Sequence, residues 1–452
     1  MSAPDPLEEL RQVEAELNQR WPETKLDPSV ERIRALAELL GDPQTSYPVL
    51  HLTGTNGKTS TSRMIDALLT RVGLRTGRYT SPHLQRVTER INVDNAPISP
   101  ERYVEVYRDV EPLVSIVDSR HEVPLSKFEV LTGMAFAAFA DAPVDAAVVE
   151  VGMGGEWDAT NIADGKVAVI TPIGLDHVDY LGSSLEGIAT EKAGIIKPGA
   201  VALLAEQDPV VEQVLLRRIA EVDAMVARQG SEFGVLQRDI AVGGQMLRLQ
   251  GLGGVYDEVF LPLHGAHQAA NAVLALAAVE AFFGAGADRQ LDVEAVREAF
   301  ATVASPGRLE RVRSAPTVLV DAAHNPHGAK ALAKALGEEF GFRKLVAVVG
   351  VMDDKDAVGI LGELEPVVDE VVLTANSSPR AMDPDLLAGV AIPIFGEDRM
   401  VVRPHLPDAI EEAVRLAEED EDGVVVSGGG VVVTGSVVTA GDARALFGKA
   451  PA

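Results

Sequence analysis

The chain alternates between short runs of β-branched residues and longer segments rich in alanine and leucine, and this alternation constrains its fold more than any other feature. The β-branched runs lie at 49–52, 146–151, 167–171, 200–204, 317–320 and 345–349. The alanine- and leucine-rich segments have helical spacing, for example at 60–72, 128–140, 268–283 and 329–340. Strands that alternate with helices form parallel sheets covered by helices. We therefore predict an α/β fold.

Two stretches interrupt this alternation. Residues 229–263 contain short strands with frequent glycine, which predicts a small antiparallel addition to the first domain. Proline and glycine then occur together at 305–308, and a second alternation of strands and helices follows. With 452 residues, and about 100–200 residues per domain, the chain has room for two or three domains. We predict a first domain at 1–303, with a mostly parallel sheet, and a smaller Rossmann-like α/β domain at 304–452.

Composition limits the partners and the compartment. The chain carries 40 lysines and arginines against 68 acidic residues, and this net charge of −28, without a basic run, opposes binding to nucleic acid. The lack of cysteine excludes disulfides, thiolate metal sites and a cysteine nucleophile. The N-terminus does not resemble a signal peptide, and residues 423–441 indicate short buried valine strands joined by glycine turns rather than a membrane span. We expect a cytoplasmic monomer without nucleic-acid or membrane partners.

The segment VLHLTGTNGKTSTSRMI, residues 49–65, predicts a phosphate-binding loop. A P-loop reads G-x-x-x-x-G-K-[ST], and Leu52 stands where the first glycine belongs. The predicted strand, small-residue turn and helix would nevertheless present free backbone N–H groups to an anion. Lys58 can neutralise phosphate oxygens, and Thr59 or Ser60 can hold Mg²⁺. The alternative is an ordinary strand-to-helix turn with a solvated lysine.

Two more predicted strands end at side chains that can bind a metal. Glu150 precedes a glycine-rich turn at 152–155, and His177 follows the next strand. Ligands bind at the carboxyl ends of strands in open α/β sheets, and a carboxylate or neutral imidazole can ligate a divalent cation. For either residue alone an ordinary role is favoured: a helix-capping or loop carboxylate for Glu150, and a hydrogen-bonded loop histidine for His177. Together with the phosphate loop they predict a metal–nucleotide site.

A series of motifs occurs in the order found in folylpolyglutamate synthases. They are GTNGKTS, YTSPHL, FEVLT, EVGMGGEWDATN, LDHVDYLG, EKAGIIK, PGRLE, DAAHNPHG and DKD. The chain thus resembles the bifunctional dihydrofolate synthases/folylpolyglutamate synthases, a family within the Mur ligase superfamily. The resemblance implies an ATP-binding Mur ligase-type central domain at 1–303 and a C-terminal glutamate-ligase domain at 304–452. It also implies an enzyme of folate and one-carbon metabolism that uses ATP and two Mg²⁺ ions.

The implied reaction joins L-glutamate to dihydropteroate, to the γ-carboxylate of a reduced folate, or to both, through an acyl phosphate. Two alternatives remain. A Mur ligase of peptidoglycan synthesis uses the same chemistry, although only about fifty residues precede the phosphate loop here, too few for a separate nucleotide-sugar domain. A nucleotide-dependent switch would need the loop but not the additional metal-site residues.

The resemblance also assigns roles around the nucleotide. The ATP-binding positions are Asn56, Gly57, Lys58, Thr59, Ser60, Asn271, Arg308 and Asp321. The positions for Mg²⁺ are Thr59 or Ser60 for the first ion, and Ser81, Glu150 and His177 for the second. Lys192 matches a catalytic lysine that the family can carry as a carbamate, an anionic oxygen ligand. A helix lysine paired with Glu191 or Glu186 is the alternative.

The substrate positions come from the same resemblance. The pterin is expected at Ser126, Lys127, Phe128, Glu129, Trp157, Asp158 and Ala159. His324, as a catalytic residue, and Ser436 would position the incoming glutamate, and the segment around Lys25 and Asp27 could close over the pterin. Relatives often carry a basic residue where this chain has Glu156, so an anionic tail is not expected to be bound there.

Overall fold

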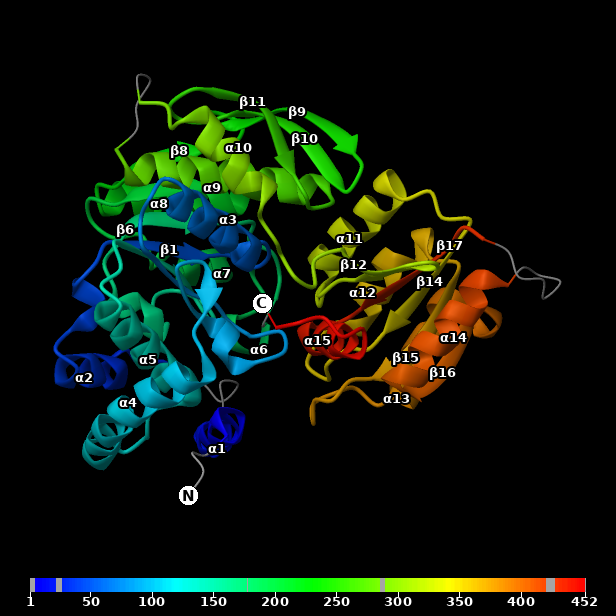
Figure 1. Cartoon of the computed structure of the whole chain (residues 1–452), viewed down its shortest axis with the longest axis horizontal. Coiled ribbons are helices and arrows are strands. Elements are labelled where there is room, and N and C mark those ends of the chain that lie inside the picture. The colour runs from blue at the N-terminus through cyan, green and yellow to red at the C-terminus, as the bar shows by residue number, and fades with distance from the viewer. Residues whose placement is uncertain (1–4, 22–26, 177, 285–288, 420–426, 452) are drawn as a thin grey trace.

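The computed structural model describes residues 5–21, 27–176, 178–284, 289–419 and 427–451. Within these ranges the chain forms an N-terminal body, comprising α1 to α10, and a C-terminal body, comprising β12 to α15, which lie side by side (Figure 1). Each body has its own sheet and its own apolar cores. The predicted α/β fold is confirmed.

The N-terminal body is built on an eight-stranded sheet of order β4-β3-β2-β5-β1-β6-β7-β8, antiparallel only at its β2-β3-β4 edge. Its strands are β1 (Val49–Thr53), β2 (Thr76–Tyr79), β3 (Ile91–Val93), β4 (Ala96–Pro97), β5 (Ala146–Glu150), β6 (Gly165–Ile170), β7 (Val201–Leu204) and β8 (Met225–Arg228). Its helices are α1 (Pro6–Asn18), α2 (Glu31–Leu39), α3 (Lys58–Arg71), α4 (Pro100–Arg120), α5 (Lys127–Asp141), α6 (Val178–Leu181), α7 (Leu185–Ala193), α8 (Pro209–Glu221), α9 (Ala266–Phe282) and α10 (Val293–Ala301).

Helices cover both faces of this sheet because alternate side chains of each strand point to opposite faces. Leu50 and Leu52 of β1 pack with α3, α9 and α10, whereas Val49 packs with α1, α2, α4 and α5 on the other face. The antiparallel sheet of β9 (Gly234–Ala241), β10 (Gly244–Gln250) and β11 (Val255–Leu261) extends the first core and confirms the predicted addition.

The C-terminal body has a six-stranded sheet of order β12-β13-β17-β14-β15-β16, parallel except for β12. Its strands are β12 (Glu310–Ser314), β13 (Thr317–Val320), β14 (Lys344–Val349), β15 (Glu370–Ala375), β16 (Met400–His405) and β17 (Gly429–Thr434). The helices α11 (Pro326–Glu339), α12 (Ala357–Leu364) and α13 (Pro384–Phe395) cover one face, and α14 (Leu406–Glu418) and α15 (Val437–Leu446) cover the other.

The valine-rich stretch at 423–441 differs from its prediction. Residues 423–426 lie outside the described residues, and β17 is a buried strand as expected. The second valine pair, however, opens α15 rather than another strand. Gly435 adopts a φ of 107° and Ser436 caps the helix by accepting a hydrogen bond from Thr439 N, so the turn overrides the β preference of valine. Among the helices of the described ranges, none has the length and apolarity of a bilayer span.

A buried ion pair joins α3 to β2 beneath the phosphate loop. Asp66 Oδ2 accepts a hydrogen bond of 2.9 Å from Arg78 Nε, and the two side chains are 0% and 1% exposed. Thr76 and Asn92 bond to the same pair. Because neither charge reaches water, each depends on its partner.

We expect Asp66→Ala to lower the free energy of unfolding by about 3–5 kcal/mol, because the buried Arg78 charge would lose its counterion. Arg415 pairs with Glu412 and Glu419 while half exposed, so Arg415→Ala is a matched control that should cost at most about 1 kcal/mol. Chemical denaturation followed by circular dichroism measures both. Equal losses in the two variants would contradict the importance of the buried pair.

Candidate active site

Two cavities lie where the loops after β1, β2, β5, β6 and β13 meet. The larger, of about 570 Å³, is lined by the phosphate loop and by residues of both bodies. The smaller, of about 300 Å³, is lined by residues before and at the start of α5, by the 152–159 turn and by the start of α15. The two share Ser81, Pro82, Gly152, Met153, His324 and Val437. A ligand in one cavity can therefore meet a ligand in the other.

Two glycines give the phosphate loop its shape. Gly54 and Gly57 have φ values of 144° and 90°, which residues other than glycine rarely adopt. A Cβ on Gly57 would lie 2.7 Å from Asn271 Oδ1, so this glycine lets α9 approach the loop. Leu52 is buried inside β1 and the loop begins only after Thr53. The position at which a standard P-loop has its first glycine therefore lies within the strand, and the loop of this chain is shorter than the standard one.

Lys58 and the two following hydroxyls have different surroundings. Lys58 Nζ donates to the carbonyl oxygens of Gly54 and Thr55, at 3.0 and 3.2 Å. Thr59 Oγ1 donates to both carboxylate oxygens of Glu150 at 3.0 Å. Ser60 Oγ is buried and lies 3.0 Å from Ser305 Oγ. Thr59, rather than Ser60, presents its hydroxyl to the Glu150 carboxylate.

Glu150 is a buried carboxylate at the end of β5. Burial raises its pKa to about 7, although Lys58 and the Thr59 hydroxyl act in the opposite direction. Ser81 lines the same cavity, while His177 lies outside the described residues. Within the described ranges no three histidine or acidic side chains form a group able to hold a metal ion. Of the residues predicted to bind a metal, Thr59, Ser60, Ser81 and Glu150 are described, and all four line the larger cavity.

Lys192 reaches the phosphate loop from the last turn of α7. Its Nζ donates to Gly54 O at 3.0 Å, the same carbonyl oxygen that Lys58 contacts. Burial, reinforced by the Lys58 charge, lowers the pKa of Lys192 to about 7. Glu191, one partner considered for this lysine, instead accepts a hydrogen bond from Trp157 N. Two amines, the buried one of Lys192 and the half-buried one of Lys58, therefore share one backbone oxygen.

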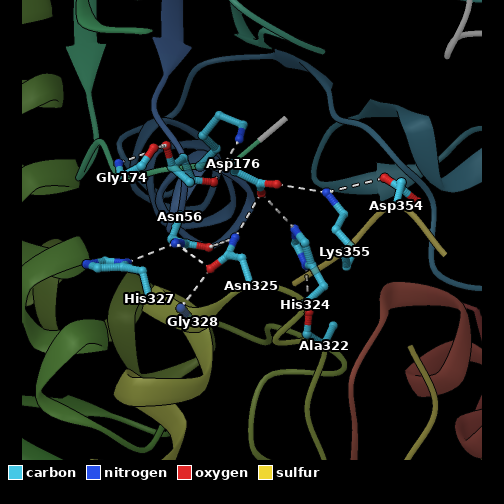
Figure 2. A network of polar contacts seen from close by, with 12 residues as sticks. Asn56, Gly174, Asp176, Ala322, His324, Asn325, His327, Gly328, Asp354 and Lys355 are labelled. Carbon is cyan, nitrogen blue, oxygen red and sulfur yellow. Dashed lines mark hydrogen bonds and ion pairs between the residues drawn. The ribbon is translucent and has the colours of Figure 1, made fainter. Parts of the chain in front are cut away.

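A polar network joins the two bodies at the mouth of the larger cavity (Figure 2). Asn56 Nδ2 donates to Asn325 Oδ1 at 3.1 Å, and Asn325 Nδ2 donates to Asp176 Oδ2 at 2.9 Å. Lys355 Nζ lies 2.8 Å from Asp176 Oδ1, and His324 Nε2 lies 3.5 Å from Asp176 Oδ2. Asn56 thus contacts the C-terminal body as well as forming part of the loop.

The other predicted nucleotide residues line the larger cavity. Arg308 and Asp321 come from the C-terminal body, and Asn271 comes from α9. The Asp321 carboxylate accepts backbone N–H groups of Leu309 and Ala323, at 2.9 and 2.8 Å. These bonds fix Asp321 against the segment that carries Arg308.

Most of the predicted pterin residues line the smaller cavity. They are Ser126, Phe128, Glu129, Trp157, Asp158 and Ala159, together with Asp27 and Ser436. Lys25 lies outside the described residues. Lys127 is not among the lining residues: as the first residue of α5 it points away, and its Nζ donates to Asn18 Oδ1 at 2.8 Å. The structure thus does not support a pterin contact by Lys127.

Two carboxylates of this cavity are already engaged by the protein. Glu129 accepts from Ser126 N at 2.7 Å and from Arg32 Nε at 3.1 Å. Asp158 accepts from the backbone N–H groups of Gly152 and Met153, at 3.1 and 3.0 Å, and so holds the glycine turn. Phe128 and Trp157 provide aromatic surface next to these groups.

Comparison with known proteins agrees with this geometry. The Mur ligase middle domain matches residues 125–279, and the Mur ligase glutamate ligase domain matches residues 307–430. The dihydrofolate synthase/folylpolyglutamate synthase of Mycobacterium tuberculosis is 60% identical over 466 residues, covering 99% of this chain and 96% of that protein. This chain belongs to the folylpolyglutamate synthase family of Mur ligases. The Escherichia coli member is 34% identical over 360 residues, covering 78% of this chain and 79% of its own.

Solved structures of the family share the whole fold. Mycobacterium tuberculosis folylpolyglutamate synthase complexed with ADP has a TM-score of 0.95 at 60% identity, covering 99% of this chain and 100% of that one. Escherichia coli FolC in complex with DHPP and ADP has a TM-score of 0.84 at 29% identity, covering 99% of each chain. As in these family members, both bodies are present in this chain.

Several residues that line the cavities or bond to lining residues were not predicted from the sequence. Asp176, Asn325 and Lys355 each lie inside a recognised motif, next to a residue that was singled out or within the DKD triplet. Their motif membership was therefore an available signal. Arg32 lies in no such motif, and it meets Glu129 across 97 residues of sequence, so only the folded chain identifies it.

Proposed function

We propose that this chain is an ATP-dependent ligase that adds L-glutamate to dihydropteroate, to the γ-carboxylate of reduced folates, or to both. One observation carries the proposal: a cavity lined by a phosphate loop adjoins a cavity with aromatic walls, and both are lined by Ser81 and His324. A phosphoryl group held in the first can reach a carboxylate held in the second. The names of the relatives support the choice of folate substrates.

Ligation needs ATP because a carboxylate is a poor electrophile. The γ-phosphoryl group would pass to a carboxylate oxygen, so its bond to ADP breaks and a P–O bond to the acceptor forms. The glutamate amine then attacks the acyl carbon, a C–N bond forms, phosphate leaves and the nitrogen loses a proton. Positioning and charge stabilisation supply most of the catalysis in such transfers.

Each group around the larger cavity has a task in this scheme. The loop from Asn56 to Gly57 and the N-terminus of α3 would hold the triphosphate, and Lys58 would leave the loop carbonyls to neutralise its oxygens. Arg308 and Asn271 line the rest of the nucleotide cavity, and Asp321 bonds to the backbone of Leu309, the residue after Arg308. His324 and Ser436 would position the incoming glutamate next to Ser81.

The described residues also fit Mg²⁺. A buried carboxylate bonded to the Thr59 hydroxyl, in a cavity that Ser81 also lines, suits a hard cation that prefers oxygen. Thr59 and Glu150 would hold the first ion, and Ser81 and Glu150 the second, with His177 added by family resemblance. When bound, the ions would offset negative charge on the phosphates.

Lys192 is a candidate for carbamylation. A neutral amine adds to CO₂ with formation of a C–N bond and release of a proton, which converts a cation into an anion. The lowered pKa makes the neutral amine available near neutral pH. Conversion would also replace the repulsion between Lys192 and Lys58, which share Gly54 O, by attraction.

The two bodies would act as the two domains predicted, 1–303 and 304–452, in a cytoplasmic monomer. The shared network at Asp176 would then be a contact between domains. Membership of the folylpolyglutamate synthase family argues against both alternatives, a Mur ligase of peptidoglycan synthesis and a nucleotide switch.

We expect purified protein with ATP, Mg²⁺ and L-glutamate to release phosphate only when dihydropteroate or tetrahydrofolate is added. A UDP-muramyl peptide serves as the matched acceptor control. Turnover with the muramyl peptide alone would replace the folate assignment, and acceptor-independent hydrolysis would favour the switch. Comparison of the two folate acceptors shows which glutamate the enzyme adds.

We expect Thr59→Val to weaken Mg²⁺-dependent ATP binding or turnover by about 10- to 100-fold, a loss typical of a disturbed metal site. Thr59→Ser keeps the hydroxyl and should remain near wild type. Ser60→Ala should have a smaller effect, because Ser60 bonds to Ser305 rather than to Glu150. Titration of Mg²⁺ in the ligase assay ranks the variants, and the reverse order would assign the ion to Ser60.

We expect ¹³C-labelled bicarbonate to give a carbamate signal in the carbon NMR spectrum at pH 8. The signal should decline below pH 7, where Lys192 becomes protonated, and should be missing from Lys192→Arg. The arginine variant should also lose ligase activity, since it keeps a positive charge beside Lys58. A spectrum at pH 8 without a Lys192-dependent signal would refute the modification.

A further inference from the structure

Helix α15 spans the distance between the smaller cavity and a loop of the N-terminal body. Its cap Ser436 and its first residues line the smaller cavity. Its middle packs against the loop that follows β2: a Cβ on Gly441 would lie 1.9 Å from Leu84 O, a backbone atom. Gly441 is buried, so this contact requires a residue without a side chain. Figure 1 shows α15 on the side of the C-terminal body that faces the N-terminal body.

The end of α15 and the segment after it form hydrogen bonds with the same loop. Arg444 is 4% exposed and bonds to Gln85 Oε1, to Glu310 Oε2 at 2.7 Å and to Ala450 O at 3.1 Å. Gln85 Nε2 in turn donates to Lys449 O at 3.0 Å. The guanidinium therefore ties the loop to β12 and to the segment after α15.

The loop itself is held as one unit. The buried Glu89 carboxylate accepts from the backbone N–H groups of Leu84, Gln85 and Arg86, at 2.8, 3.1 and 3.0 Å. Because these residues are bonded to one carboxylate, we expect a shift of Leu84 to move the neighbouring loop residues with it. Ser81 stands three residues before Leu84 and lines both cavities.

We infer that Gly441 and Arg444 are positioning residues, which set the place of Ser81 relative to Ser436. Helix α15 has Ser436, expected to position glutamate, at its start. Through Gly441 and Arg444 it also holds the loop that follows Ser81, a predicted metal ligand. The inference rests on the proposed function, in which Ser81 and Ser436 act on reacting partners. Misplacement of such groups by 1 Å can cost about 100-fold in rate.

The test compares Gly441→Ala with Gly389→Ala. Gly389 lies inside α13, and a Cβ there has no atom within 4 Å, so both variants make the same chemical change within a helix of the C-terminal body. We expect Gly441→Ala to lower kcat of folate-dependent ligation by about 10-fold or more, while ADP affinity stays close to wild type and the protein remains folded at the assay temperature. Gly389→Ala should match wild type in all three.

A folded Gly441→Ala with wild-type kcat would overturn the inference, as would equal losses of kcat, ADP affinity and Tm. If this variant does not fold, Gln85→Ala tests the contact from the loop side and should lower kcat in the same direction; wild-type kcat would again overturn it. Crystal structures of Gly441→Ala and wild type give a readout without activity. An unchanged separation of Ser81 and Ser436 in the two crystal structures would overturn the inference, whatever the activity. A wild-type enzyme that uses no folate acceptor would instead reject the proposed function.

Discussion

The site depends on three ionisable side chains that lie close together, mostly out of contact with water, around the backbone oxygen of Gly54. Lys58 and Lys192 both donate to Gly54 O, and Glu150 is buried close to Lys58. Burial acts against the charged form of each group, lowering the pKa of Lys192 and raising that of Glu150. Anionic phosphates and a cation would restore favourable partners to all of them. Ligand binding, rather than stability of the empty chain, explains why these charges are placed together.

The same site depends on contact between two separately built bodies. Each has a mainly parallel sheet with its own core, and their loops meet at Asp176 and at the contact of α15 with Leu84. Groups expected to bind ATP and glutamate come from both bodies. Catalysis in this arrangement requires that a few polar contacts and the close approach at Gly441 keep the two bodies in a fixed relative position. Reacting groups held by different bodies tolerate little displacement from one another.

Much of this could be predicted from local patterns. Strand ends and glycine turns indicated Lys58 and Glu150, because those patterns report backbone shape directly. Thr59 and Ser60 could not be separated, since adjacent helical residues point in different directions that only packing determines. Lys127, predicted beside the pterin, does not line the smaller cavity and bonds to Asn18, a direction that the sequence pattern alone does not give. Arg444 escaped notice because its partner Gln85 is 359 residues away along the chain.

The central claim is that this site activates a carboxylate by phosphorylating it. The most direct measurement uses a folate acceptor whose reacting carboxylate carries ¹⁸O in both oxygens. The account predicts that each amide bond formed leaves one ¹⁸O atom in the released phosphate, because the acyl phosphate passes an acceptor oxygen to phosphorus. Amide formation accompanied by unlabelled phosphate would contradict it.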